Sequence, residues 1–214
     1  MFKFHDVEQN TDEWFDLRSG RITGSAMSKA MANYGKAFGE PAKKYAVNIA
    51  IEQITGKSIS SEQYNNEHMD RGHEEEPIAR MLYEEEYFCE VTNGGFFDCG
   101  DIGCSPDGMV NDDGLIEIKS AIPSMHYSRI AKQSYDSAYK WQIIGNLKLT
   151  ERDWIDFISY CSWFPEGRRL YVHRSYKEDF VEEFNMIDIR IGEFRDLIKS
   201  TKEIILNNNY SITG

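Results

Sequence analysis

The chain has 214 residues, of which 41% are hydrophobic and 13% aromatic, and its formal net charge is −12. This length and composition exclude a disordered chain, and they predict a single globular domain over residues 1–214 with its own buried core. No apolar run is long enough to cross a membrane and the N-terminus lacks the pattern of a secretory signal, so we expect a cytoplasmic protein.

The acidic balance limits how the chain could meet nucleic acid. Phosphate contacts need a local excess of Lys and Arg, so a net charge of −12 argues against broad binding to a polyanion. Carboxylates gathered at one point reverse this expectation, because they bind divalent cations whose charge then faces a phosphate. Any nucleic-acid site must therefore be local.

The four cysteines show no C-x-x-C pair and no histidines at ligand spacing. A zinc site needs such spacing, so buried free thiols are the better interpretation, and we assign no disulfide. The residues concerned are Cys89, Cys99, Cys104 and Cys161.

The first segment with a clear helical signature is "TDEWFDLRSG", residues 11–20. Thr11 suits the N-cap, acidic residues follow in the first turn, Arg18 lies in the last turn, and Gly20 suits the terminator. Residues 11–20 therefore predict a short helix.

Three more segments in the first half have helical spacing. We expect a second helix over 24–35, and a clearly amphipathic third one over "EPAKKYAVNIAIEQITG", residues 40–56. After a polar stretch, "HEEEPIARMLYEEEY" predicts a fourth helix. Proline fits only a first turn or a kink, so this helix should begin near Glu75 or bend at Pro77.

The second half changes from helical to strand period. Turn signals divide residues 89–121 into short strands, which predict an antiparallel meander. A helix over 137–149, strands over 153–163 and 168–176, and a terminal helix over about 178–206 follow. The expected fold class is α/β (α+β), with a central mixed and largely antiparallel sheet flanked by helices.

Chemistry concentrates in "GCSPDGMVNDDGLIEIKSA". Side chains two apart on a strand share a face, so Glu117 and Lys119 should point the same way while the isoleucines between and before them enter the core. The "NDDG" turn can fold the preceding strand back and bring Asp107 near Glu117. Two close carboxylates resist ionising together, and a divalent cation between them relieves the repulsion.

Such a site suits Mg²⁺-assisted attack of water on a phosphodiester, with Lys119 orienting or activating the nucleophile. The plainer alternative is a hairpin whose exposed face carries a cross-strand acid and lysine. For "ExK" alone that alternative would be preferred. The joint appearance of Pro-Asp-Gly, the turn and the acid-x-Lys favours the metal site.

This joint pattern resembles the PD-(D/E)xK nuclease superfamily, and neighbouring motifs narrow the resemblance to the lambda exonuclease family of YqaJ-type viral recombinases. "EWFDLRSGRITGS" resembles its W-x-x-L-R-x-G-x-I-T-x-S element, and "RGHEEEPIAR" is similar to its glycine-and-glutamate helix. "CSPDGM" and "LIEIKSA" match its catalytic strands, and "AYKWQI" its downstream glutamine helix. These blocks cover roughly the first three quarters of the chain and imply a restriction-endonuclease-like core.

The resemblance implies a set of metal ligands and a pair of further active-centre residues. The metal ligands are Glu76, Asp107, Glu117 and the backbone carbonyl of Ile118, and the others are Lys119 as catalytic lysine and Gln142 as the helix glutamine near the active centre. Judged from the residues alone, the run "HEEE" would be a solvated helix face, and only the G-x-x-x-E spacing selects Glu76.

The resemblance also implies contacts with the DNA end. Arg18, Ser25 and Ser105 correspond to residues around the terminal 5′-phosphate, where a guanidinium and hydroxyl donors suit a phosphate monoester. From the residues alone, Arg18 would be a cation at a helix C-terminus. Met69 falls where the family places an apolar side chain that splits the duplex end, and a surface or packing role is the alternative.

The implied function is a Mg²⁺-dependent 5′-to-3′ exonuclease on double-stranded DNA ends, which leaves 3′ overhangs for phage or prophage recombination. Two Mg²⁺ ions are expected, replaceable by Mn²⁺, together with a single-strand annealing protein as partner, a ring-shaped homotrimer, and the cytoplasm of a bacterial host. One alternative is a structure- or site-specific endonuclease of the same fold, and another is a non-catalytic module that binds DNA ends.

Overall fold

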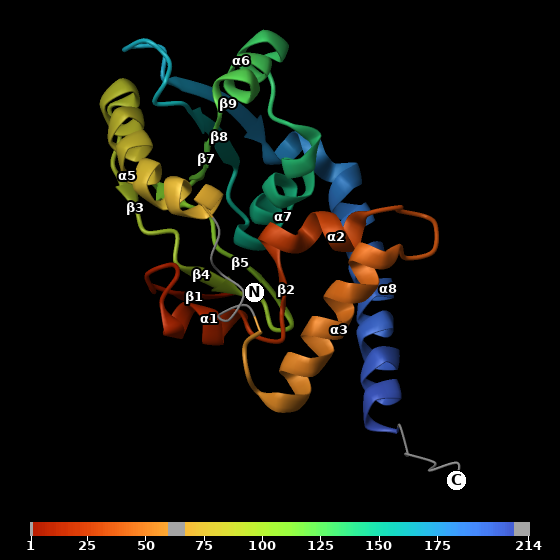
Figure 1. Cartoon of the computed structure of the whole chain (residues 1–214). Helices are drawn as coiled ribbons and strands as arrows, with labels where there is room; N and C mark the ends of the chain where they lie inside the picture. The colour runs from red at the N-terminus through yellow and green to blue at the C-terminus, as the bar shows by residue number, and fades with distance from the viewer. Residues whose placement is uncertain (1, 60–66, 208–214) are drawn as a thin grey trace.

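The computed structural model describes residues 2–59 and 67–207, and within the range 67–70 the backbone alone. Two mixed β-sheets are flanked by helices, and the long helix α8 (Val181–Leu206) lies beside α3 (Glu40–Thr55) at one end of the molecule (Figure 1). The α/β fold class predicted from the sequence is confirmed. None of the helices in the described ranges is long and apolar enough to cross a bilayer.

The smaller sheet has four short strands in the order β1-β4-β5-β2. Its strands are β1 (Lys3–His5), β2 (Ile22–Thr23), β4 (Phe96–Asp98) and β5 (Ile102–Cys104). β2 pairs with β5 in parallel and the other pairs are antiparallel. This sheet therefore joins the N-terminal segment to the middle of the chain.

The larger sheet has five strands in the order β3-β6-β7-β8-β9. Its strands are β3 (Val91–Thr92), β6 (Gly108–Val110), β7 (Gly114–Ser120), β8 (Trp154–Tyr160) and β9 (Leu170–Tyr176). β7 and β8 run parallel, and the remaining neighbours are antiparallel. The connection between the parallel pair is helical, as a crossover requires.

The single meander predicted over 89–121 is wrong. β4 and β5 form a hairpin in the smaller sheet, whereas β3 and β6, on either side of that hairpin in sequence, pair with each other in the larger sheet. β4 and β5 find their outer partners in β1 and β2, which are close to the N-terminus. Long-range pairing has thus overridden the local pattern.

The predicted N-terminal helices form with changed lengths. α1 (Asp12–Arg18) has Thr11 as its N-cap, and α3 (Glu40–Thr55) ends at Gly56, whose φ of 67° is left-handed. The second helix, predicted over 24–35, is shorter than expected. Its first residues form a 3₁₀ turn at Gly24–Ala26, and the α-helix α2 covers only Met27–Met31.

The fourth helix begins earlier than expected. α5 (Glu67–Tyr87) contains Pro77 in its interior, so of the two alternatives the start near Glu75 is wrong, and the bend at Pro77 stays a prediction. The terminal helix α8 (Val181–Leu206) follows a 3₁₀ turn at Lys177–Phe180, close to the predicted bounds.

Two helices connect the parallel strands β7 and β8. α7 (Lys140–Thr150), after a 3₁₀ turn at Ser137–Tyr139, was predicted. α6 (Pro123–Lys132) was not, because its pattern is inverted: His126 and Arg129 are buried while its apolar side chains are largely exposed. Hydrophobic periodicity would place the opposite face of such a helix against the core.

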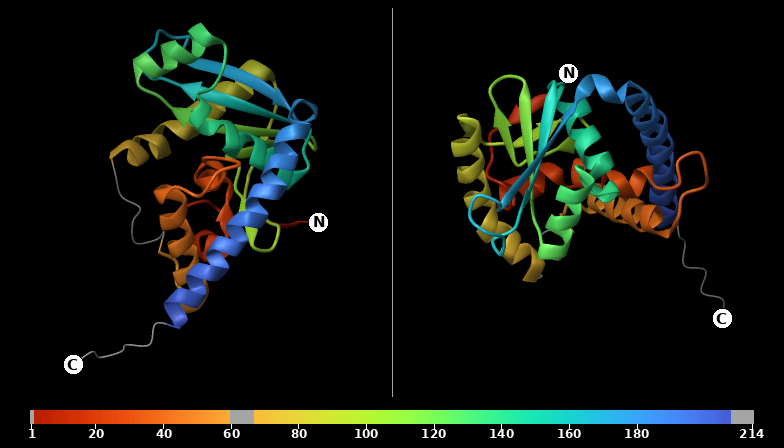
Figure 2. Two further views of the ribbon diagram at one scale, coloured as in Figure 1. Left: turned by 90° about the vertical axis from the view of Figure 1, so that its right-hand side faces the viewer. Right: turned by 90° about the horizontal axis from the view of Figure 1, so that it is seen from above.

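α5 covers one face of the larger sheet, and α6 and α7 cover the other (Figure 2). On the α5 side, Ala79 and Tyr83 pack with Ile116, Ile118 and Ile158. The alternation along β7 therefore directs Leu115, Glu117 and Lys119 towards the α7 side. A second core lies between α2, α3 and α8.

All four cysteines are free thiols, but only two of them are buried, where the sequence predicted burial for all four. Cys104 and Cys161 are buried, and Cys89 and Cys99 are half-buried. Burial raises the pKa of the Cys104 thiol well above its usual value, which keeps it protonated.

Candidate active site

The β6–β7 hairpin brings Asp107 to Glu117, as the sequence predicted. Gly108 lies opposite Ile116, and the Asp107 amide donates to the Ile116 carbonyl at 3.1 Å. Oδ2 of Asp107 then accepts a hydrogen bond of 2.6 Å from the amide of Ile118. The Asp107 carboxylate is therefore fixed against the middle of β7, next to the side chain of Glu117.

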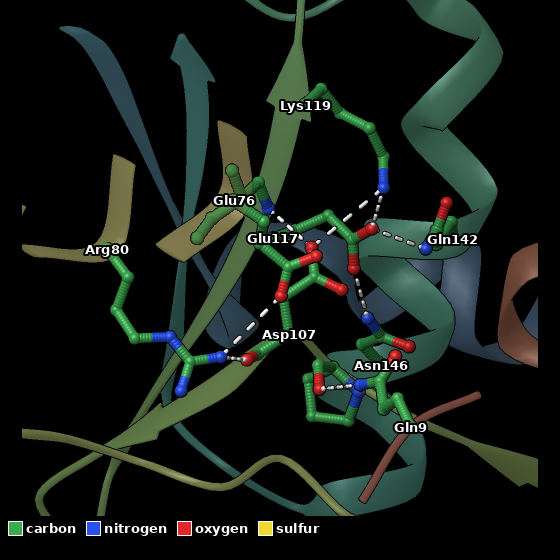
Figure 3. Close-up of polar contacts among 10 residues, drawn as sticks. Gln9, Glu76, Arg80, Asp107, Glu117, Lys119, Gln142 and Asn146 are labelled. Carbon is green, nitrogen blue, oxygen red and sulfur yellow. Dashed lines mark hydrogen bonds and ion pairs between the residues drawn. The ribbon is translucent and has the colours of Figure 1, made fainter. Parts of the chain in front are cut away.

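Glu117 is a buried carboxylate with three donors around it (Figure 3). Gln142 Nε2 donates to Oε1 at 2.6 Å, and Asn146 Nδ2 donates to Oε2 at 3.1 Å. Lys119 Nζ donates to Oε1 as well, and lies 3.9 Å from Asp107 Oδ2. A carboxylate taken out of water needs such partners, because an unpaired buried charge is costly.

The electrostatics of this cluster follow from burial and crowding. Burial, and then the charge of Asp107, raise the pKa of Glu117 to about 7, although Lys119 partly opposes the rise. Burial by itself lowers the pKa of Lys119, but the attraction of Glu117 and Asp107 outweighs it and the pKa is raised overall. Lys119 is thus a cation at neutral pH, suited to donating hydrogen bonds.

Glu76 reaches the same cluster from α5. Its carboxylate lies 3.6 Å from Arg80, one turn later on the helix. Burial, and then the charge of Asp107, raise the pKa of Glu76 to about 7. Figure 3 shows its side chain turned towards Asp107. Among the three consecutive glutamates of this helix, residues 74–76, Glu76 is therefore the one whose carboxylate lies near Asp107.

The neighbouring acid Glu75 has a different environment. Its carboxylate accepts hydrogen bonds from Ser120 and, at 2.5 Å, from Ser162, and lies 3.8 Å from Arg71. Glu75 thus ties α5 to the end of β7 and to the segment that follows β8. The alternative of a purely solvated acidic face does not describe Glu75 or Glu76.

The donor set around Asp107 suits a hard divalent cation. It offers carboxylate oxygens of Glu76, Asp107 and Glu117 and the backbone carbonyl of Ile118, and Mg²⁺ prefers such oxygen ligands. Among the residues that the structure describes, no three His, Cys, Asp or Glu side chains already stand in metal-ligand geometry. Arg80 and Lys119 pair with two of the acids instead. The residues fit a metal, and their roles as ligands stay a prediction.

The raised pKa of Glu117 predicts how the metal-free protein responds to pH. Because the folded state holds this proton more tightly than the unfolded state, stability falls as pH rises from about 4.5 towards about 7. Each tenfold difference in proton affinity between the two states corresponds to about 1.4 kcal/mol. Chemical denaturation in EDTA across this pH range should show the decline, and Glu117→Gln should make it shallower, with the remainder coming from Glu76, whose pKa is also raised to about 7. An equal slope in both proteins would contradict the prediction.

The three residues predicted to bind a 5′-phosphate are linked through a fourth, Trp14. Arg18 Nη2 donates to Ser25 Oγ at 3.0 Å, and the guanidinium lies 3.9 Å from the centre of the Trp14 ring. The Trp14 indole donates to Ser105 Oγ at 2.8 Å. Ser105 is two residues before Asp107, so this group adjoins the carboxylates. Arg18 is also the last residue of α1, which keeps the helix-end interpretation open.

Met69 lies in the first turn of α5, and its side chain is outside the described part of the chain. Its predicted role as a wedge stays a prediction.

Sequence reasoning assigned no role to four residues that hold the site: Gln9, Trp14, Arg80 and Asn146. Asn146 had a local signal, since it lies four residues after Gln142 and so shares its helix face. Gln9 and Arg80 contact the Pro106–Asp107 backbone from distant parts of the chain. No local pattern reveals contacts of that kind.

Two solved exonuclease structures are similar to this chain over most of its length. The alkaline exonuclease LHK-Exo from Laribacter hongkongensis is 28% identical, covers 93% of this chain and 100% of its own, and has a TM-score of 0.76, or 0.78 in its complex with dAMP. A phage-related exonuclease from Haemophilus somnus 129PT shares the fold at 16% identity, with a TM-score of 0.67 over 88% of this chain and 96% of its own.

Among curated proteins, none matches the chain. The family described as the YqaJ-like viral recombinase domain matches residues 13–153, which is more than half of the sequence and includes Asp107, Glu117, Lys119 and Gln142. The chain belongs to the YqaJ-like viral recombinase family, as its motifs predicted.

Proposed function

We propose that this protein is a metal-dependent exonuclease that degrades one strand of duplex DNA from its 5′ end and leaves a 3′ overhang. The observation that carries the proposal is the buried Glu117 bonded to Lys119 beside Asp107, since a carboxylate pair with an ammonium suits phosphodiester hydrolysis. Similarity to an alkaline exonuclease, at 28% identity over 93% of the chain, supports nuclease activity.

Each residue of the cluster has a role in this proposal. Glu76, Asp107, Glu117 and the Ile118 carbonyl would hold two Mg²⁺ ions, which Mn²⁺ can replace. When bound, the metal supplies Lewis-acid chemistry at the scissile phosphate. Lys119 orients the attacking water as a donor. Gln142 and Asn146 hold the Glu117 carboxylate, so that it can neither rotate nor retreat into solvent.

Polarity depends on a different group of residues. The catalytic carboxylates would hydrolyse either strand, so the 5′ start is inferred from Arg18, Ser25 and Ser105 as the site of the terminal phosphate. Their hydroxyl and guanidinium donors lie beside the segment that carries Asp107. A phosphate held there would bring the next phosphodiester towards the carboxylates.

The test uses linear duplex DNA labelled at one end, with 5′-phosphate or 5′-hydroxyl termini. Early release of the 5′ label, dependence on Mg²⁺ and loss with EDTA are expected. Cleavage of covalently closed circular duplex would instead favour a structure- or site-specific endonuclease. Tight binding of ends without any cleavage would favour the non-catalytic module.

The biological setting is inferred from the family. We propose that the 3′ overhangs serve phage or prophage recombination in the cytoplasm of a bacterial host, through a single-strand annealing protein as partner. The whole of 1–214 is proposed to act as one nuclease domain. Coprecipitation of such a partner, encoded beside this chain, would test the pairing.

We also propose a ring-shaped homotrimer, and expect high processivity together with modest affinity. A chain with a net charge of −12 cannot hold DNA by counterion release over its whole surface, whereas a ring can retain DNA topologically. Light scattering should give about three times the mass of one chain. When excess competitor DNA is added during digestion, the enzyme should still finish the duplexes that it has already begun to degrade. A monomer that digests distributively would contradict this prediction.

A further inference from the structure

Asp107 lies in the link 105–107, which joins β5 to β6, and these strands belong to different sheets. Backbone groups within a sheet are paired by the ladder, but the carbonyl groups of a link between sheets need other partners. Pro106, directly before Asp107, has no N–H group of its own to contribute. The place of the Asp107 carboxylate therefore depends on side chains that hold this link.

Two side chains hold the carbonyls of consecutive residues in the link. Gln9 Nε2 donates to the Pro106 carbonyl at 2.9 Å, and Arg80 Nη2 donates to the Asp107 carbonyl at 2.6 Å. Figure 3 shows them approaching from different sides. Gly94 packs closely too, because a Cβ there would lie 1.8 Å from the Pro106 oxygen. Three distant segments thus converge on two carbonyl groups.

Arg80 makes a second contact that concerns the site directly. Its guanidinium lies 3.6 Å from the carboxylate of Glu76, so one side chain touches both Glu76 and the main chain of Asp107. Gln9, Glu76, Arg80 and Asp107 line the same cavity, of about 500 Å³. Arg80 therefore links two acids that come from different elements, α5 and the β5–β6 link.

We propose that Arg80 is a positioning residue that, with help from Gln9, sets Asp107 and Glu76 at the spacing needed to share a divalent cation. This rests on the metal-dependent reaction proposed above. Because Arg80 contacts Asp107 and Glu76 rather than the cation or the DNA, its effect on metal binding is exerted through these two residues. Gln9 restrains the same link one residue earlier, without adding charge.

Arg80 has two opposed influences on a cation at this site. Its positive charge repels the cation, whereas its two contacts orient the ligands. Removing Arg80 tightens cation binding if repulsion dominates and weakens it if orientation dominates. The proposal commits to orientation, and the sign of the change in affinity therefore decides between the two.

The test is calorimetric titration of Mn²⁺ into the full chain without DNA, with thermal unfolding in EDTA alongside. Arg80→Met should weaken Mn²⁺ binding roughly tenfold or more, as loss of a residue that orients metal ligands does elsewhere. Arg80→Lys should restore part of the affinity, and Gln9→Met should weaken binding by a smaller factor. The matched control is Arg152→Met.

Arg152 also holds backbone carbonyls of the same hairpin, but at its turn: Nη1 donates to Asn111 O at 2.8 Å and Gly114 O at 2.9 Å. The control should lose stability in EDTA and keep its Mn²⁺ affinity. Binding by Arg80→Met that equals or exceeds the wild type would overturn the proposal. Should that variant not fold, unchanged affinity in both Arg80→Lys and Gln9→Met would overturn it equally.

Failure of this inference can be told apart from failure of the proposed function. If the wild-type chain degrades DNA while Mn²⁺ affinity is unchanged in the variants, the positioning role alone is wrong. If Arg80→Met weakens Mn²⁺ binding while the wild-type chain degrades no DNA, the exonuclease proposal alone is wrong. A wild-type chain that binds no Mn²⁺ overturns the positioning role.

Discussion

Lys119→Ala should fold and bind DNA ends but lose turnover by roughly 10²–10⁴-fold, the range found when a positioned proton donor or acceptor is removed. The ammonium of Lys119 bonds Glu117 and lies 3.9 Å from Asp107, so it is placed where an attacking water must be oriented. Lys119→Arg should not rescue turnover, because a planar guanidinium cannot replace a compact ammonium in this space.

Alanine variants of the two central carboxylates, Asp107 and Glu117, belong in the same cleavage and binding assays. Asp107→Ala and Glu117→Ala should abolish cleavage and leave DNA-end binding measurable, because losing a metal ligand removes the Lewis acid more completely than it removes phosphate contacts. Single-turnover cleavage and binding are measured on the same labelled duplex. Thermal unfolding of each variant shows whether the chain is folded.

Lys148 offers a matched control for Lys119. Its side chain is 23% exposed, against 25% for Lys119, and its ammonium pairs at 2.9 Å with Asp188, which lies in α8. Lys148→Ala should leave turnover within about twofold of the wild type, as expected for a partly exposed ion pair. A near-wild-type rate for Lys119→Ala would show that the proposed chemistry is wrong.

The sequence predicted those site residues whose positions depend on neighbouring residues in the chain, namely Asp107, Glu117 and Lys119. A tight turn between adjacent strands fixes the register of β6 on β7, and the period of two places Glu117 and Lys119 on one face. Asp107 then has to lie near the middle of β7. Glu76 could be selected only by resemblance, because a run of acids on a helix has no preferred member.

What the sequence did not predict depends on long-range contacts. β4 and β5 look like members of one meander, yet their partners β1 and β2 lie near the N-terminus. Similarly, Arg80 acquires its role from a carbonyl 27 positions later in the chain. Such pairings follow from the packed fold and leave no periodic trace in the sequence.

α6 shows a different limit. His126 shares the Ser159 hydroxyl with Arg129, and Arg129 also binds Asp136, so the buried face of this helix is polar and internally satisfied. Met125 and Tyr127 are exposed instead. Rules that place apolar residues inside and polar residues outside predict the reverse orientation or no helix at all.

Arg18→Ala should remove most of the preference for a 5′-phosphorylated end. A terminal phosphate carries nearly two negative charges near neutral pH and presents three oxygens, which a guanidinium and hydroxyl groups can hold. The Arg18 guanidinium lies over the Trp14 ring and donates to Ser25, and Trp14 in turn donates to Ser105, so these contacts restrain the guanidinium near both serines. The expected loss on phosphorylated ends is roughly ten- to hundredfold, as for a hydrogen bond to a charged group.

The measured quantity is the ratio of initial rates on 5′-phosphate and 5′-hydroxyl duplexes. Arg18→Ala should lower this ratio towards one, with little change on hydroxyl ends, and should shorten the tract degraded per binding event. Ser25→Ala and Ser105→Ala should lower it less, because each removes a neutral donor. Arg21→Ala serves as the control, since Arg21 bonds the carbonyls of Leu17 and Gly100 and pairs with Asp98.

The control separates a general loss of structure from a loss of phosphate binding. Arg21→Ala should reduce stability and slow both substrates alike, so its ratio should match the wild type. If Arg18→Ala also keeps the wild-type ratio, Arg18 acts as the cation at the C-terminus of α1 and stabilises that helix by at most about 1 kcal/mol. The 5′ start would then lose its support in this chain, because the carboxylates and Lys119 would hydrolyse a strand of either polarity.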